Sequence, residues 1–466
     1  MSGPIADVCL VTEGYPFAGD TAAVSGWVGD LVATLGGTRF RIVCASALAA
    51  GSPPSATAAA DVLPRATRHV LPANAGPALF CPILPPDEGA PVAGTGLEGG
   101  RATSGADLGR ALLLAAADGG DRNVARGVAR RLALAAVPFA RVYHAVGGAA
   151  AVTVAAAAAL ATSRPLVVTP SGLGPRGVAA PGAARRDGGE IGPGGPADGH
   201  PGRASAEDPG LAAGLRIGLE RAAACLAPDE ALRRRAVAAG APAESARVLP
   251  FGVDVEACAR RPRGGARSAT TVALIADIVP DEDVATFLRG ARILIERLDL
   301  VDLYALGATD RDPAYLRYCA RLAQTLGLVR LVRFVGPVDP AEIFGALDCL
   351  VLAGADDRLP PVAVEALAMG IPIVSSDLSG ARDVVAGRLP EDRALGWAGR
   401  LFAFGDADDL AAAVVASAGD AAARRRMEAV ARLRARRFYD RPTLLGEVAD
   451  LYEALAARPA GERWSA

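Results

Sequence analysis

The sequence predicts two tandem α/β domains, each built on a parallel, doubly wound sheet. The chain has 466 residues, which is too many for one hydrophobic core. Apolar residues make up 51% and aromatic residues 5% of the chain, as in globular proteins that are soluble in water. Short apolar runs alternate with helical segments along most of the sequence, and this order of elements is typical of repeated βα units.

The first domain is expected to span residues 1–245. Its expected strands are 8–12, 40–44, a strand that ends at 142–144, 166–169 and 224–227. Its expected helices are 23–35, 149–161, 211–223 and one that ends at 239. Residues 50–107 are irregular, and the Gly, Pro, Ala and Arg-rich segment 174–210 is expected to be a mobile loop.

The second domain is expected to span residues 246–440. Its expected strands are 271–275, 302–306, 332–335, 349–352 and 371–375. Its expected helices are 283–296, 313–326, 340–347, 362–369 and 406–436. A last helix at 442–457, within a segment 441–466, is expected to cross back to the first domain. Two such sheets in tandem place their switch points across a central cleft, where ligands bind.

The segment 357–377 carries the clearest chemical signal in the chain. Pro361 can only stand at a helix start, and Gly370 is a typical helix stop. Asp357 therefore precedes a helix, and Glu365 lies one turn into it, with seven residues between the two acids. Both acids face a helix N-terminus, where backbone amides attract anions and bind hydroxyl groups.

Composition excludes several other classes of function. The formal net charge is −2, so the sequence offers no basic surface for nucleic acid. The seven cysteines are scattered without a C-x-x-C pair, which indicates buried free thiols in a reducing compartment. The three histidines show no metal-ligand spacing, so no metal site is predicted. No signal peptide is recognised, and the Ala-rich run 149–161 is too short to span a bilayer.

The segment 357–377 resembles the donor-sugar motif of the family 4 glycosyltransferases, E-x7-E followed by E-A-[ML]-A-x-G-x-P, with Asp in place of the first Glu. Further segments, in order, resemble the cytoplasmic glycosyltransferase of Pel-type exopolysaccharide assembly. They are Thr12–Pro16 with Val24, Ser25, Trp27 and Val28, Tyr143–Val146, Gly307–Tyr315 with Cys319 and Leu326–Leu328, and Val332–Asp339.

The resemblance implies a GT-B fold and metal-independent, retaining hexosyl transfer from a nucleotide sugar such as UDP-glucose to a glycan acceptor. It implies no cofactor, a cytoplasmic location and partners among membrane-embedded polysaccharide assembly proteins. Glu365 takes the role that holds the ribose hydroxyls, and Asp357 the role that contacts the donor sugar, with a side chain one methylene shorter. At the two positions where the family has a phosphate-binding Arg and Lys, this chain has Asp277 and Glu282.

The first-domain part of the pattern also departs from the family. A Gly-Gly pair that lets the backbone approach the phosphates is replaced by Ala22 and Ala23. Ser171 stands where the family has a His beside the sugar, and no base near it in sequence supports a role as nucleophile. Glu13 is a candidate acid on the acceptor side of the cleft, or a cap of the following turn. His144 is either a substrate contact there or a structural residue at a strand end.

Removing one preorganised donor typically lowers a rate by about 10²–10³, and here two cations are replaced by anions. Three explanations are open: the acids stabilise the start of a helix, they bind Mg²⁺, or a displaced Arg289 or Arg358 restores the cation. The acids concerned are Asp277, Asp281, Glu282 and Asp283. Two functions follow: a glycosyltransferase with weakened or lost catalysis, or a non-catalytic relative that binds a partner enzyme, a glycan or a nucleotide.

Overall fold

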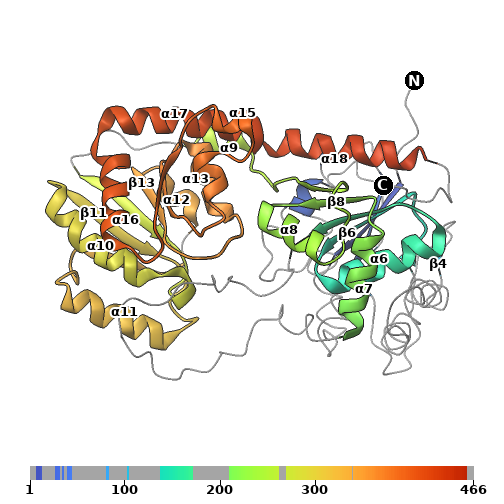
Figure 1. The fold of residues 1–466 in the computed structure, drawn as a ribbon, viewed down its shortest axis with the longest axis horizontal. Helices are drawn as coiled ribbons and strands as arrows, with labels where there is room; N and C mark the ends of the chain where they lie inside the picture. Colours follow the sequence, from blue (N-terminus) through green and yellow to red (C-terminus); the bar gives the residue numbers. More distant parts are fainter. Residues whose placement is uncertain are drawn as a thin grey trace. The chain divides into compact units, whose positions relative to one another are not determined.

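The computed structural model describes residues 7–12, 27–31, 34–35, 39–44, 80–82, 102–103, 137–171, 209–261, 269–337 and 339–458. These residues divide into two units. One contains the described residues up to 171 together with 209–251 and 442–458, and the other contains those from 252 to 441. Each unit is built on a parallel sheet covered by helices, which confirms the predicted fold class (Figure 1).

The first unit contains a seven-stranded parallel sheet. Its strands, in spatial order, are β3 (Phe80–Pro82), β2 (Arg39–Cys44), β1 (Asp7–Thr12), β6 (Val142–Gly147), β7 (Leu166–Pro170), β8 (Ala224–Ala227) and β9 (Ala246–Val248). Residues 246–248 were assigned to the second domain, but they form β9, which pairs with β8, so the first unit continues past 245 to Phe251. Two short strands, β4 (Ala102–Thr103) and β5 (Val137–Pro138), pair separately and antiparallel.

Helices cover both faces of this first sheet. On one face α6 (Ala149–Thr162) packs against α7 (Pro209–Glu220), and on the other α18 (Arg441–Ala456) supplies Leu445, Val448 and Tyr452 to the core (Figure 1). The Ala-rich sequence of α6 has a packing reason, because a Cβ at Gly218 of α7 would lie 2.4 Å from a Val152 side-chain carbon. Small residues on both helices therefore allow their backbones to approach closely.

The second unit contains a six-stranded parallel sheet. Its strands, in spatial order, are β12 (Val332–Val335), β11 (Val301–Leu306), β10 (Thr270–Ile275), β13 (Cys349–Leu352), β14 (Ile373–Ser376) and β15 (Gly399–Phe402). This is the doubly wound order, with the reversal between β10 and β13. Of the two edge strands of this sheet, β12 was predicted from the sequence and β15 was not.

The helices of the second unit lie on both faces of its sheet. They are α9 (Val255–Ala259), α10 (Val284–Arg297), α11 (Pro313–Thr325), α12 (Pro340–Phe344), α13 (Pro361–Met369), α14 (Arg382–Ala386), α15 (Pro390–Arg393), α16 (Ala407–Val414) and α17 (Ala421–Phe438). Alternate strand residues enter opposite cores, as strand geometry requires. Val272 and Leu274 face α10, α11 and α16, whereas Ala273 faces α9, α13 and α17.

The long helix expected at 406–436 is two helices with a break between them. A π-helical turn, Val415–Gly419, follows α16, and the Asp420 side chain then caps α17 by accepting a hydrogen bond from the Ala422 amide at 2.8 Å. A π turn followed by a helix cap leaves no hydrophobic signature in the sequence, so the pattern predicted one continuous helix.

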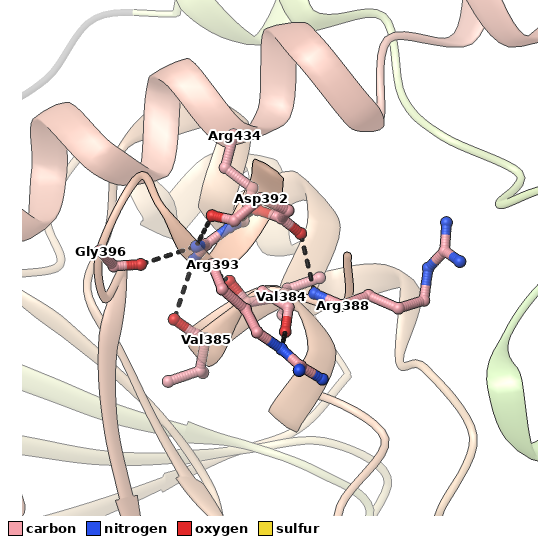
Figure 2. A network of polar contacts seen from close by, with 8 residues as sticks. Val384, Val385, Arg388, Asp392, Arg393, Gly396 and Arg434 are labelled. Atoms are coloured by element: carbon pink, nitrogen blue, oxygen red, sulfur yellow. Dashed lines mark hydrogen bonds and ion pairs between the residues drawn. The ribbon is translucent and has the colours of Figure 1, made fainter. Parts of the chain in front are cut away.

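Helix α17 is held to the unit by a fully buried arginine (Figure 2). Arg434 donates through Nε to the Asp392 carboxylate, and through Nη1 to the carbonyls of Val384 and Val385 at 2.9 and 2.8 Å. Its Nη2 donates to the carbonyls of Asp392 and Gly396 at 3.0 and 2.7 Å. Each of its nitrogens thus has an acceptor, which offsets the cost of burying the charge.

Candidate functional site

Four loops meet at the carboxyl edge of the second sheet, around the point where the strand order reverses. The amide of Ala355, after β13, donates to the carbonyl of Asp281, after β10, at 3.2 Å. The amide of Gly380, after β14, donates to the carbonyl of Asp356 at 2.9 Å. The amide of Ile278, after β10, donates to the carbonyl of Ala308, after β11, at 2.9 Å. Open α/β sheets bind their ligands at this position.

Asp357 lies in the loop that joins β13 to α13, and its side chain is half-buried. The loop passes so close to Gly380 that a Cβ there would lie 2.5 Å from the carbonyl oxygen of Asp357 and 2.2 Å from the carbonyl carbon of Arg358. The absence of a side chain at Gly380 therefore allows this loop to pack against the segment that follows β14. Arg358 folds onto its own loop and binds Asp356, with Nε 3.0 Å from Oδ1 and 3.1 Å from Oδ2.

Glu365 lies one turn into α13, as predicted, and the helix ends at Gly370, where φ is 72°. Its carboxylate is half-buried, and burial raises its pKa above the usual range. Arg261 opposes this shift, Asp339 adds to it, and Arg441 opposes it, so two guanidinium groups and one further acid lie near Glu365. Among the described residues none donates a hydrogen bond to this carboxylate.

Arg261 is a residue of this site that was not predicted from the sequence. It follows helix α9, which is too short for its period to be recognised. Its Nη1 atom is buried and has no acceptor in the described structure. Arg441 is held at the carbonyl oxygen of Gly252 by Nε at 3.2 Å and Nη2 at 2.8 Å. The Arg261 guanidinium is a buried donor without an acceptor, and the nearby Glu365 carboxylate is a half-buried acceptor without a donor. This pair is suited to a ligand that carries both a hydrogen-bond acceptor and a hydrogen-bond donor.

Asp277 ties together the loops that follow β10 and β11. Its Oδ1 accepts from the amide of Ala308 at 3.0 Å, and its Oδ2 lies 3.2 Å from Nε of Arg311. The two loops approach so closely that a Cβ at Gly307, where φ is 155°, would lie 2.0 Å from the carbonyl oxygen of Ala276. Asp277 thus has a local structural role, and its ion pair holds Arg311 at the same edge of the sheet.

Glu282 and Asp283 lie at the start of α10, where a 3₁₀ turn, Pro280–Glu282, precedes the helix. The Glu282 carboxylate lies against Gly354, with Oε2 2.7 Å from the position that a Cβ there would occupy. Asp283 has φ 44° and caps α10 by accepting from the Thr286 amide at 3.2 Å. Burial raises the pKa of Asp283 above its usual range. The helix-start interpretation therefore holds for Asp283.

Magnesium binding and a displaced arginine were the two further explanations for the acids of this region. Within the described ranges, no three His, Cys, Asp or Glu side chains gather as a group that could hold a metal ion. Arg289 is directed to α11, where its Nη2 lies 3.3 Å from the Tyr318 hydroxyl oxygen. Of the two arginines expected as replacements, only Arg358 lies in a loop at the carboxyl edge. Arg311 is a third arginine at this edge, and it was not expected from the sequence.

His144 of the first unit is a core residue. It lies in the middle of β6, not at its end, and its side chain is fully buried. Nδ1 lies 2.5 Å from the Tyr452 hydroxyl of α18, and Nε2 lies 2.8 Å from Oγ1 of Thr169. Burial lowers the pKa of His144 to about 3. The structure therefore supports the structural interpretation of His144 and corrects its assignment as a substrate contact, because no face of the ring is open.

The remaining candidates of the first unit are less informative. Ser171 follows β7, is half-buried, and donates its amide to the carbonyl of Gly147 at 3.2 Å. The acid at Glu13 and the pair Ala22 and Ala23 lie outside the described residues. The five cysteines whose side chains are described are buried thiols, and burial raises the pKa of Cys225 and Cys349 to about 12. Among the described helices, none combines the length and apolarity that crossing a membrane requires.

Comparison with known proteins identifies the class of this fold. Residues 269–420 match the family model for glycosyl transferases group 1. The whole chain is similar in structure to HepE from Anabaena in complex with UDP, with a TM-score of 0.60, 16% identity and coverage of 96% of this chain and 99% of that one. A glycosyltransferase from Rickettsia africae gives a TM-score of 0.61 at 11% identity, covering 97% of this chain and 100% of that one. The chain therefore has the GT-B fold, and residues 269–420 of its second unit are similar to the group 1 glycosyl transferases.

Curated relatives share part of this sequence. A phosphatidyl-myo-inositol mannosyltransferase of Mycolicibacterium smegmatis is 30% identical over 217 residues, which are 45% of this chain and 52% of the relative. A D-inositol 3-phosphate glycosyltransferase of Jonesia denitrificans is 29% identical over 188 residues, 35% of this chain and 44% of the relative. The amylovoran biosynthesis glycosyltransferase AmsK of Erwinia amylovora is 27% identical over 187 residues, 39% of this chain and 44% of the relative. The chain thus spans about half the length of these relatives.

Proposed function

We propose that this protein is a glycosyltransferase of polysaccharide biosynthesis that transfers a hexosyl group from a nucleotide sugar to a glycan acceptor, with retention and without a metal ion. The observation that carries the proposal is the position of Asp357 and Glu365. They lie on the loop and first turns of α13, beside the strand reversal between β10 and β13. A ligand site is expected there in an open α/β sheet, and the group 1 domain covers the same residues.

Glu365 is suited to bind the ribose of the donor. A cis-diol can donate two hydrogen bonds through its hydroxyl groups. The half-buried Glu365 carboxylate accepts no hydrogen bond from the described residues. The orphaned Nη1 of Arg261 would donate to an oxygen of the same ligand. A hydrogen bond that involves a charged group contributes about 1.5–3 kcal/mol, so these two residues can account for much of nucleoside affinity.

Asp357 is suited to orient the hexose. In the reaction the bond between the anomeric carbon and the diphosphate oxygen breaks, the acceptor hydroxyl forms a bond on the same face, and its proton leaves with the diphosphate. The diphosphate gains charge as it departs, so its surroundings decide the rate. The carboxylates of Asp277 and Glu282 lie in the loop where cations are expected, and the Arg311 guanidinium partly neutralises Asp277. We therefore propose that transfer is slow and that nucleotide sugar is bound weakly.

The same acids favour a second candidate function. Asp277 joins two loops through Ala308 and Arg311, and Glu282 packs on Gly354, so both acids are built into the local structure. A site rebuilt in this way can serve a non-catalytic relative that binds nucleotide, glycan or a partner enzyme in a biosynthetic complex. In either case we propose a cytoplasmic protein that acts beside membrane-embedded assembly proteins of the Pel type.

Calorimetry with UDP and with UDP-glucose, each with and without Mg²⁺, separates these functions when it is combined with an assay for UDP release. Slow, metal-independent UDP release together with UDP binding supports the transferase. Binding without release under any acceptor condition supports the non-catalytic relative. Tight, micromolar binding without metal would show that the phosphate site is intact, and no binding under any condition would exclude the transferase.

A further inference from the structure

The outward face of α17 carries four arginines around one exposed leucine. The buried side of the helix is Met427, Ala431, Arg434 and Ala435. Arg425, Arg426, Leu433, Arg436 and Arg437 are exposed and lie on the opposite side, as the spacing of three and four residues requires. Leu433 is 51% exposed. Together with Trp397 we call these residues the α17 basic face.

The charges of this helix are sorted between its two sides. The other arginines of the helix are compensated, since Arg424 and Arg432 contact Glu428. The buried Arg434 binds Asp392 (Figure 2). The four outward arginines make no ion pair with any residue in the described ranges. The face therefore carries four uncompensated positive charges on a chain whose formal net charge is −2.

Trp397 is a second exposed apolar residue close to α17. The residue before it, Gly396, accepts a hydrogen bond from Arg434 at 2.7 Å, and a Cβ there would lie 3.8 Å from a Val430 side-chain carbon. Trp397 thus lies beside the helix, and it is 47% exposed. Positive charges with an exposed tryptophan and leucine among them are the composition of a helix that lies on a bilayer surface.

We propose that the α17 basic face binds the surface of an anionic phospholipid bilayer. The guanidinium groups pair with lipid phosphates, while Leu433 and Trp397 enter the headgroup region. Charge complementarity alone would also suit a soluble polyanion. The two apolar side chains favour lipid, because they gain nothing from a hydrated acidic polymer and gain burial in a bilayer. Binding of this kind would place the second unit beside a membrane irrespective of whether it catalyses transfer.

Co-sedimentation of the full chain with vesicles tests the proposal. The wild type is expected to bind vesicles of phosphatidylcholine with phosphatidylglycerol, and not vesicles of phosphatidylcholine alone. Changing Arg425, Arg426, Arg436 and Arg437 to Gln should weaken this binding by about 600-fold, at roughly fivefold per arginine. The control changes Arg297, Arg317, Arg321 and Arg330 to Gln. It removes the same charge from α10, α11 and the following loop, on the other face of the sheet, and should leave binding nearly unchanged.

A second variant, Leu433→Ser with Trp397→Ser, separates lipid from a soluble polyanion. It should lower vesicle binding at high salt, where the electrostatic part is screened, and alginate should compete poorly with vesicles. Circular dichroism confirms that each variant is folded. The proposal is overturned if the two vesicle types bind equally, if the control loses as much as the test variant, or if alginate competes fully and the Ser variant binds like the wild type.

Discussion

Asp277 and Arg311 form an ion pair between the loops that follow β10 and β11, with Nε of Arg311 3.2 Å from Oδ2 of Asp277. Both side chains remain partly exposed, at 33% and 41%, so the pair itself contributes little to stability. Its importance is electrostatic, because an acid and not a cation holds the position nearest the expected diphosphate. The ion pair with Asp277 places the Arg311 cation at the same edge of the sheet.

Restoring the family charges should strengthen nucleotide binding. In the double variant Asp277→Arg with Glu282→Lys, repulsion of the diphosphate is replaced by attraction, and we expect UDP to bind at least about tenfold tighter, or roughly 1.4 kcal/mol. Calorimetry at low salt measures the change. The neutral pair Asp277→Asn with Glu282→Gln is the matched control and should give a smaller gain. If the double variant binds no better than the wild type, the diphosphate does not lie at this loop.

Removing the Glu365 charge should weaken binding of the nucleoside. Glu365→Gln keeps the size of the side chain but loses the charged acceptor for the ribose diol, so UDP affinity should fall by about 10–100-fold, from a loss of roughly 1.5–3 kcal/mol. Uracil, which has no ribose, should show no difference between the two proteins. An equal loss for UDP and uracil would contradict the ribose assignment. Glu428→Gln, on α17, is a control for nonspecific effects of the charge change.

The pH dependence of UDP binding follows from the same residue. Burial raises the pKa of Glu365, and two ribose hydroxyl donors would favour its ionised form and lower that pKa. Binding should therefore release protons and become stronger as the pH rises through the pKa of the free protein. Calorimetry in buffers of different ionisation enthalpy measures the proton count. In Glu365→Gln the proton release should disappear, and its persistence would assign the titration to another group.

His144 should make the first unit sensitive to acid. Its pKa is lowered from 6.5 to about 3 by burial, so the unfolded chain binds a proton that the folded chain does not. Stability is full above pH 6.5 and falls as the pH drops towards 3, by up to about 4–5 kcal/mol for the whole shift. Denaturant unfolding between pH 7.5 and about 4.5 measures this loss. His144→Gln, which does not titrate, should flatten the profile, and an unchanged slope would assign it to other groups.

Arg434 and Asp392 should be coupled in stability. Arg434→Met leaves the buried Asp392 carboxylate without its partner and should destabilise the second unit by about 3–5 kcal/mol. Arg432→Met, two positions earlier on α17 and partly exposed, should cost less than about 1 kcal/mol. Thermal unfolding measures both variants. Adding Asp392→Asn to Arg434→Met should recover part of the loss, and a further loss instead would show that Asp392 is held mainly by other contacts such as the Arg388 amide.

Local chemistry made much of the second unit predictable. Strand β13 is a short run of apolar residues, and α13 is bounded by Pro361 and Gly370, so its position followed from proline and glycine geometry. Strand β15 was not expected, because its sequence, Gly399–Phe402, begins with Gly and Arg and is not an apolar run. Helix α9 was not expected, because its five residues are too few to show a helical period. Arg261 was missed with α9, although it is the buried donor beside Glu365.

The sequence by itself determined the doubly wound βα order, the boundaries of α13 and the spacing of Asp357 and Glu365, because these depend on residues close together in the chain. Only the tertiary structure decided which side chains meet. In the folded chain Asp277 pairs with Arg311 across two loops, and His144 is buried against Tyr452, which is 308 residues away. Strand β9 pairs with β8 and so belongs to the first sheet. Such contacts depend on the order of strands and the register of loops, and neither is encoded in any local pattern.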